Sequence, residues 1–130
     1  YDGAWTASAP GMQTIAQDKA ESALRALLRV IIETSCSHVL RRLTSNEQLL
    51  EKIPKYRTEM GFGLHVGWAI EGAIGSVHKV DPSYLSPHVE MSQKLEAGTK
   101  HYGVCILMTK DFYDLLPPKV QRLCRCVDRA

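Results

Sequence analysis

The chain has 130 residues, a formal net charge of +2 at pH 7, and a hydrophobic content of 45%. This length is enough for one domain with its own core, and this composition excludes wholesale disorder. The small net charge gives no electrostatic reason to expect a nucleic-acid or membrane-surface partner, and no apolar run of the sequence is long enough to cross a membrane.

The first half of the chain is predicted to be helical. Residues 1–14 are rich in Gly, Ala, Ser, Thr and Pro, which is typical of a loop. Apolar residues then recur at helical spacing over residues 15–43, so a long amphipathic helix is expected there. Ser45 and Gln48 have the spacing of a capping box, which predicts a short second helix that Pro54 stops.

Strands are predicted next. Residues 57–70 mix aromatic and apolar residues in a pattern that favours a strand. Gly72 and Gly75 indicate a turn, and a second strand is expected over residues 77–80.

A third helix is predicted over residues 86–101, because serine is a favoured N-cap and the proline that follows it is a favoured first helical residue. Gly103 is expected to end this helix. The apolar run 104–108 suits a short buried strand, and a final helix is predicted from Lys110 to Pro117.

This order of elements predicts an α+β fold, with a ferredoxin-like α/β sandwich as the leading architecture. We expect a single domain over residues 1–130. It would consist of a loop at 1–14, a helical segment at 15–57, and a strand-turn-strand-helix-strand-helix unit at 58–130.

Cysteine and histidine usage does not indicate a metal site. The four cysteines, at positions 36, 105, 124 and 126, lack the spacing of zinc or dithiol redox motifs, and the five histidines form no His-x-x-x-His cluster. Reduced thiols are ordinary inside cells, so we expect an intracellular domain. The sequence lacks an initiator methionine, so we expect it to be a piece of a longer protein, and we expect this piece to be the cytosolic part.

Two motifs carry a family resemblance. Residues 61–75 read GFGLHVGWAIEGAIG, and residues 89–96 read VEMSQKLE. This succession resembles the second half of the class III nucleotidyl (adenylate/guanylate) cyclase catalytic domain. The family pattern is a Gly-Leu-His-x-Gly strand, a Gly-x-x-Gly turn and a Val-Asn-x-Ala-x-Arg-Leu-Glu helix. The resemblance covers residues 58–128, and more loosely 15–43, and it implies a ferredoxin-like cyclase homology domain that is incomplete at both ends.

The resemblance also implies site residues. In the family, two paired domains make cyclic nucleotide from ATP or GTP, and an Asn and an Arg of one helix act on the ribose and the phosphates. The Asn position is Glu90 here and the Arg position is Lys94, so both catalytic positions are substituted. Glu90 would repel a triphosphate, and Lys94 lacks the planar fork of arginine. Their spacing also fits a simple ion pair on the helix surface.

Two further positions follow from the resemblance. The purine-selecting position falls at Ser83, and a serine there favours guanine or no purine selection. Residues 81–83 also have the sequence of an ordinary turn. Magnesium or manganese is implied by the family, with most of its ligands outside this chain. Asp2 is the one metal-ligand candidate, and residues 1–14 can equally be a loop that has lost both aspartates.

Two functions remain open. The chain is either one half of a paired nucleotidyl cyclase, or a catalytically inactive cyclase-like pseudoenzyme that acts as a dimerisation or scaffold module in signal transduction. The resemblance implies the same partner in both cases, a second cyclase homology domain in a homo- or heterodimer. The chain alone is expected to make no cyclic nucleotide.

Overall fold

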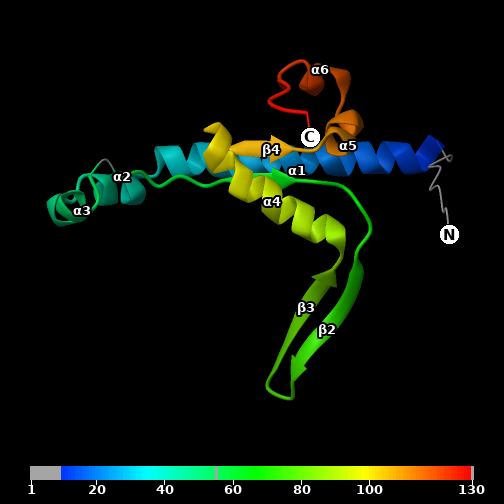
Figure 1. Ribbon diagram of the computed structural model, residues 1–130, viewed down its shortest axis with the longest axis horizontal. Coiled ribbons are helices and arrows are strands. Elements are labelled where there is room, and N and C mark those ends of the chain that lie inside the picture. Colours follow the sequence, from blue (N-terminus) through cyan, green and yellow to red (C-terminus); the bar gives the residue numbers. More distant parts are fainter. Residues whose placement is uncertain (1–9, 55, 130) are drawn as a thin grey trace. The chain divides into compact units, whose positions relative to one another are not determined.

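The computed structural model describes residues 10–54 and 56–129, and it contains both helices and strands (Figure 1). This mixed content agrees with the predicted α+β class. The described strands form two sheets of two strands each, one of β1 and β4 and one of β2 and β3. They do not join into one continuous four-stranded sheet.

The chain divides into two compact units. One contains the described residues up to Met60 together with Leu115–Pro117, and the other contains Gly61–Asp114 and the residues from Pro118 onward.

The first helix, α1, spans Pro10–Cys36. It begins within residues 1–14, so the prediction of a loop is wrong from Pro10 onward. Ala20 and Leu24 are buried, as expected for the apolar positions of an amphipathic helix. Among the described residues, no helix is long and apolar enough to span a membrane.

Ser37 divides the helix that was predicted over residues 15–43. Its hydroxyl oxygen accepts a hydrogen bond from the backbone N–H of Leu40 at 3.4 Å and caps α2 (His38–Thr44). A serine side chain competes for backbone N–H groups in this way and favours a new helix start over continuation of the old one. The apolar pattern therefore continues through the break, whereas the helical backbone does not.

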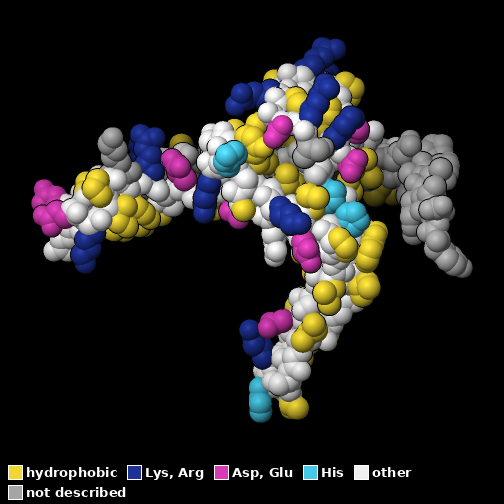
Figure 2. All heavy atoms as spheres, viewed as in Figure 1, with side chains coloured by type: hydrophobic (Ala, Val, Ile, Leu, Met, Phe, Trp, Pro, Cys, Tyr) yellow, Lys and Arg dark blue, Asp and Glu magenta, His cyan; other side chains and the backbone are white. Residues whose placement is uncertain are grey.

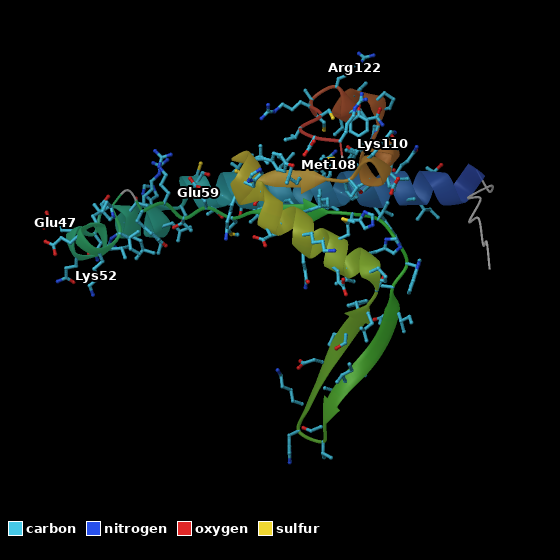
Figure 3. The ribbon with its side chains drawn as sticks, viewed as in Figure 1. Glu47, Lys52, Glu59, Met108, Lys110 and Arg122 are labelled. Atoms are coloured by element: carbon cyan, nitrogen blue, oxygen red, sulfur yellow. The ribbon has the colours of Figure 1, made fainter. Side chains whose placement is uncertain are left out.

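Asn46, not Ser45, caps the third helix, α3 (Glu47–Lys52), so the predicted capping box is out of register. The Asn46 side chain accepts a hydrogen bond from the backbone N–H three residues later, at 3.3 Å. Glu47 and Lys52, at the two ends of α3, have the charges that complement the helix dipole (Figure 3). The helix ends before Pro54, as predicted.

Two short parallel strands form the first sheet. Strand β1 (Phe62–Leu64) pairs with β4 (Ile106–Met108), and Gly63 lies opposite Leu107. The predicted strand at 104–108 is therefore confirmed over its last three residues. The longer strand predicted over residues 57–70 is reduced to these three residues of β1.

The second sheet is a hairpin of β2 (Ile70–Ser76) and β3 (Lys79–Leu85). Gly72 and Gly75 lie inside β2, so the prediction of a turn at these glycines is wrong. The turn consists of residues 77–78, where the Ser76 hydroxyl accepts a hydrogen bond from the next-but-one backbone N–H at 3.3 Å. A serine that bonds its own backbone two residues later is itself a turn signal.

Helix α4 (Pro87–Tyr102) begins after Ser86 and ends before Gly103, as predicted. The Ser86 side chain accepts a hydrogen bond from the backbone N–H two residues later at 3.0 Å. Gly103 ends the helix in the left-handed conformation, with φ of 63°, which glycine adopts at little cost. The predicted final helix corresponds to α5 (Lys110–Leu115), and a short helix α6 (Pro118–Gln121) follows that was not predicted.

Candidate functional site

The backbone of helix α4 packs directly against the backbone of strand β1. A Cβ atom added at Gly63 would overlap the backbone of α4 at Ser92, and one added at Gly61 would overlap the side chain of Thr99. Thr99 is only 2% exposed, so this contact is buried. The alternating glycines of the first motif therefore have a physical reason, because any side chain at these positions would push the helix away.

This packing determines which face of α4 is available to other molecules. An α-helix turns by about 100° per residue, so Glu90 and Lys94 both lie about 160° around the helix from Ser92. Since Ser92 faces β1, the two substituted catalytic positions lie on the opposite face, and both side chains are exposed. The structure thus brings Glu90 and Lys94 onto one accessible surface.

The ion pair that the spacing of Glu90 and Lys94 allows is not formed. Within residues 10–54 and 56–129, ion pairs join other side chains, and neither Glu90 nor Lys94 has a side-chain partner. Glu90 lies in the first turn of α4, where a negative charge interacts with the helix dipole and stabilises the helix by about 0.3–1 kcal/mol. Both charges are therefore available to groups outside this unit.

Ser83 lies on β3, opposite Gly72, and not in a turn. Because side chains alternate along a strand, it shares one face of the hairpin with three apolar residues. These residues, Ile70, Ile74 and Leu85, are 65%, 59% and 65% exposed. Hydrophobic side chains are visible along the hairpin in Figure 2.

No hydrogen bond in the described part of the chain links Ser83 to Glu90 or Lys94, so the three positions do not form a site by direct contact. Asp2 lies outside the described residues. Within those residues, no group of three or more His, Cys, Asp or Glu side chains could hold a metal ion.

Sequence reasoning missed one polar cluster. His65 follows β1 and hydrogen-bonds through Nδ1 with Thr109 Oγ1 at 2.9 Å and through Nε2 with His88 Nδ1 at 2.7 Å. Burial lowers the pKa of His65, the charge of His88 lowers it further, and Asp111 opposes the shift. The histidine of the first motif was a signal for this cluster, but its partners are 23 and 44 residues away in sequence.

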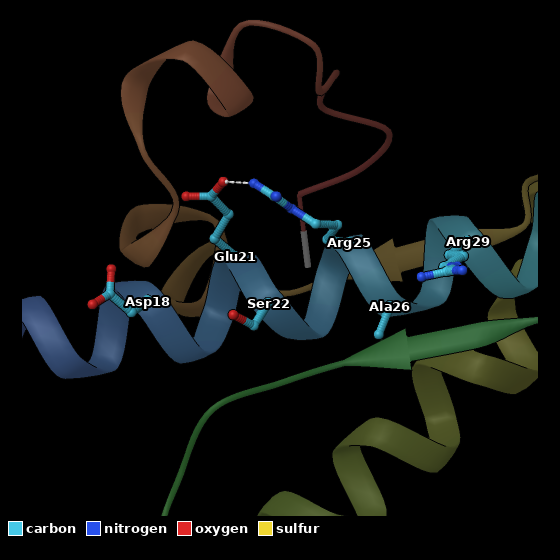
Figure 4. Close-up of a pocket in the computed structure, with 6 residues that line it drawn as sticks. All are labelled: Asp18, Glu21, Ser22, Arg25, Ala26 and Arg29. Atoms are coloured by element: carbon cyan, nitrogen blue, oxygen red, sulfur yellow. Dashed lines mark hydrogen bonds and ion pairs between the residues drawn. The ribbon is translucent and has the colours of Figure 1, made fainter.

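The pockets of the helical unit are not lined by any of the predicted site residues. One runs along α1 between Asp18 and Arg29, and Glu21 and Arg25 on its wall form an ion pair at 2.6 Å (Figure 4). A hollow that a single helix lines encloses little of a ligand, whereas ligand pockets bury most of theirs. We therefore assign no binding role to it.

Comparison with known proteins points to adenylate cyclases. The chain is 32% identical to an adenylate cyclase of Anabaena cylindrica over 54 residues, which are 42% of this chain and 11% of that protein. It is 29% identical to adenylate cyclase 1 of Rhizobium meliloti (strain 1021) over 63 residues, which are 48% of this chain and 9% of that protein. The matched segments thus span about a tenth of each relative. No model of a protein family matches the chain, and neither does any solved structure.

The close contact of α4 with β1 predicts that Gly63→Ala destabilises the strand-containing unit. The added methyl group meets backbone atoms of α4, which cannot rotate away as a flexible side chain would. Overpacking of this kind costs about 1–3 kcal/mol, and urea unfolding measures it.

Gly72→Ala is the matched control, because a Cβ at Gly72 has no atom within 4 Å. It should leave the free energy of unfolding unchanged or slightly raised, since alanine restricts the unfolded chain. If both variants unfold at the same urea concentration as the parent, the strand and the helix are not in backbone contact.

Proposed function

We propose that the chain is part of a nucleotidyl cyclase homology domain and contributes one half of a paired site for ATP or GTP. The partial similarity to two adenylate cyclases supports the family. The observation that carries the proposal is the position of Glu90 and Lys94 on the face of α4 opposite β1, exposed and without partners among the described residues. A second domain can reach both side chains there.

The chemistry of this half-site differs from that of an intact one. The Lys94 ammonium group can bind phosphate oxygens as a point charge, without the two parallel hydrogen bonds of a guanidinium. Glu90 presents a negative charge where a neutral amide would contact the nucleotide, and it repels the phosphates. We propose that the partner domain supplies the intact amide and guanidinium, and that this half contributes mainly surface and shape.

The ferredoxin-like architecture is part of this proposal. The parallel pair of β1 and β4, with α4 between them in the sequence, is compatible with one half of such a sandwich. The hairpin of β2 and β3 inserts between β1 and α4.

The metal ions of the family do not fit the described residues, because these residues include no cluster of three potential ligands. We therefore derive no catalytic step through magnesium or manganese on this chain. If the parent protein is active, its metal-holding carboxylates come from Asp2, from other segments of the parent or from the partner.

The second candidate function is an inactive cyclase-like module that pairs and regulates. It is favoured by the position of Glu90 in the first turn of α4. There the carboxylate stabilises the helix through its interaction with the helix dipole, so this residue can be explained without a bound nucleotide. The exposed apolar face of the hairpin suits a pairing role in both functions.

Pairing through the hairpin can be tested on the full-length protein with Ile74→Lys. This change puts a positive charge among the exposed apolar side chains of this face, next to the ion pair that Lys79 and Asp81 form on it. Light scattering should show association weakened at least tenfold, because a buried lysine without its hydration is costly.

Ala73→Lys is the control, since this neighbouring side chain points to the other face of β2. The Ala73→Lys variant should associate as strongly as the unmutated full-length protein. A full-length protein that is monomeric at micromolar concentration, or an Ile74→Lys variant that associates normally, contradicts pairing through this face.

The double variant Glu90→Asn/Lys94→Arg separates the two functions in the full-length protein. It removes the charge that repels the phosphates and restores the bidentate fork, so nucleotide affinity or turnover should rise. One such transition-state contact is worth about 3 kcal/mol, which is well within the range of a radiolabelled turnover assay. Each single change should do less, because Glu90 would bind the new arginine and Lys94 would still lack the fork.

If the double variant binds ATP and GTP no better than the unmutated full-length protein does, the nucleotide site lacks more than the amide and the guanidinium. The pairing module is then the function, and the nucleotide proposal is withdrawn.

A further inference from the structure

The two ends of the hairpin are joined by a pair of histidines. His65 lies after β1, His88 lies in the first turn of α4, and the segment between them contains the whole β2–β3 hairpin. His65 Nε2 and His88 Nδ1 are 2.7 Å apart, which is a short hydrogen bond between two imidazole rings. This bond therefore closes the base of the hairpin.

Packing holds the His88 ring in place for this bond. The two imidazole rings lie edge to edge along this bond, with centroids 4.9 Å apart and planes at 27°, and the Trp68 ring meets the His88 ring edge-on at 5.8 Å. A Cβ at Gly67 would overlap the imidazole ring, so this glycine provides the space for it. The histidine pair is thus a packed arrangement with three neighbours, and not a chance contact of two surface side chains.

One arrangement of protons fits the hydrogen bonds around the pair. The Thr109 hydroxyl oxygen accepts from the Phe112 backbone N–H at 3.4 Å, so its own hydrogen is available to His65 Nδ1 at 2.9 Å. His65 then carries its proton on Nε2 and donates it to His88 Nδ1. This assignment, inferred from the network, gives each of these three hydrogen bonds one donor and one acceptor with both rings neutral.

Added protons change the pair in two steps. A first proton can go to His65 Nδ1, because the Thr109 hydroxyl can turn and accept from it, and one proton still lies between the rings. A second proton on His88 Nδ1 puts two N–H groups face to face, so the bond is lost. The second positive charge would also lie at the N-terminal end of α4, where the helix dipole is itself positive.

We propose that the His65–His88 pair is a proton-operated clamp, which holds the base of the hairpin closed while the pair carries at most one added proton and opens when both rings are protonated. Opening frees residues 66–87 from the contact between β1 and α4. The clamp makes the position of the hairpin depend on pH, whether or not the hairpin pairs with a second domain.

The surrounding charges set the direction of this dependence. His88 on α4 and Asp111 on α5 are the charged neighbours that act on His65, and Lys110 beside them is paired with Asp114. Burial lowers the pKa of His65 below 6.5, so the unfolded or opened chain binds more protons than the closed one. The closed state is therefore fully favoured above pH 6.5. It is weakened as the pH falls through the lowered pKa of His65, and it opens when His88 also takes a proton.

Amide hydrogen exchange of the full-length protein tests the clamp. After correction for the intrinsic effect of pH on exchange, peptides covering residues 66–69 and 86–90 should exchange at least tenfold faster at pH 5 than at pH 7.5. His88→Phe and His65→Phe retain a ring for packing and remove the shared proton. Each should give fast exchange that no longer depends on pH, and one of them suffices if the other does not fold.

His78→Gln is the matched control, because His78 is an exposed histidine at the turn of the same hairpin. It should retain the full pH response of the parent. The clamp is refuted if the parent exchanges equally at both pH values, or if a folded phenylalanine variant retains the response.

Discussion

The structure of the strand-containing unit depends on the approach of helix α4 to strand β1. Gly61 and Gly63 remove the side chains that would separate the two elements, and the backbone of α4 and the buried Thr99 side chain occupy that space. Cores are packed closely enough that one added methyl group must displace something. The rotation of α4 is therefore set by glycine, and the positions of all its other side chains follow from this rotation.

The two surfaces to which we assign a function follow from this one contact. On the outer face of α4, Glu90 and Lys94 stand exposed where a partner can meet them. At the N-terminal end of the same helix, His88 rests on Gly67 and bonds to His65. A change that shifted α4 on β1 would alter both, so the proposed nucleotide half-site and the proposed pH response of the hairpin depend on the position of the same helix.

The two ends of α4 were predictable from sequence, whereas the starts of α1, α2 and α3 and the ends of the strands were not. Ser86 and Gly103 set the ends of α4 through local backbone chemistry that needs no tertiary context. The glycines of β2 were interpreted as a turn because glycine is common in turns and uncommon in strand interiors, and only the pairing of β2 with β3 reveals the strand. The histidine pair was missed because it joins residues far apart in sequence, and the Ser37 break because a single cap interrupts a helix without changing its apolar period.

The outward orientation of Glu90 and Lys94 is the central claim, and it can be measured by isotope-edited nuclear Overhauser spectroscopy. The account predicts contacts from the α-protons of Gly63 to Ser92 on α4, and none from β1 to the side chains of Glu90 and Lys94. Contacts from β1 to either of these two side chains, with none to Ser92, would show that α4 is rotated by half a turn. The proposed half-site would then be buried inside the unit, and the account would be contradicted.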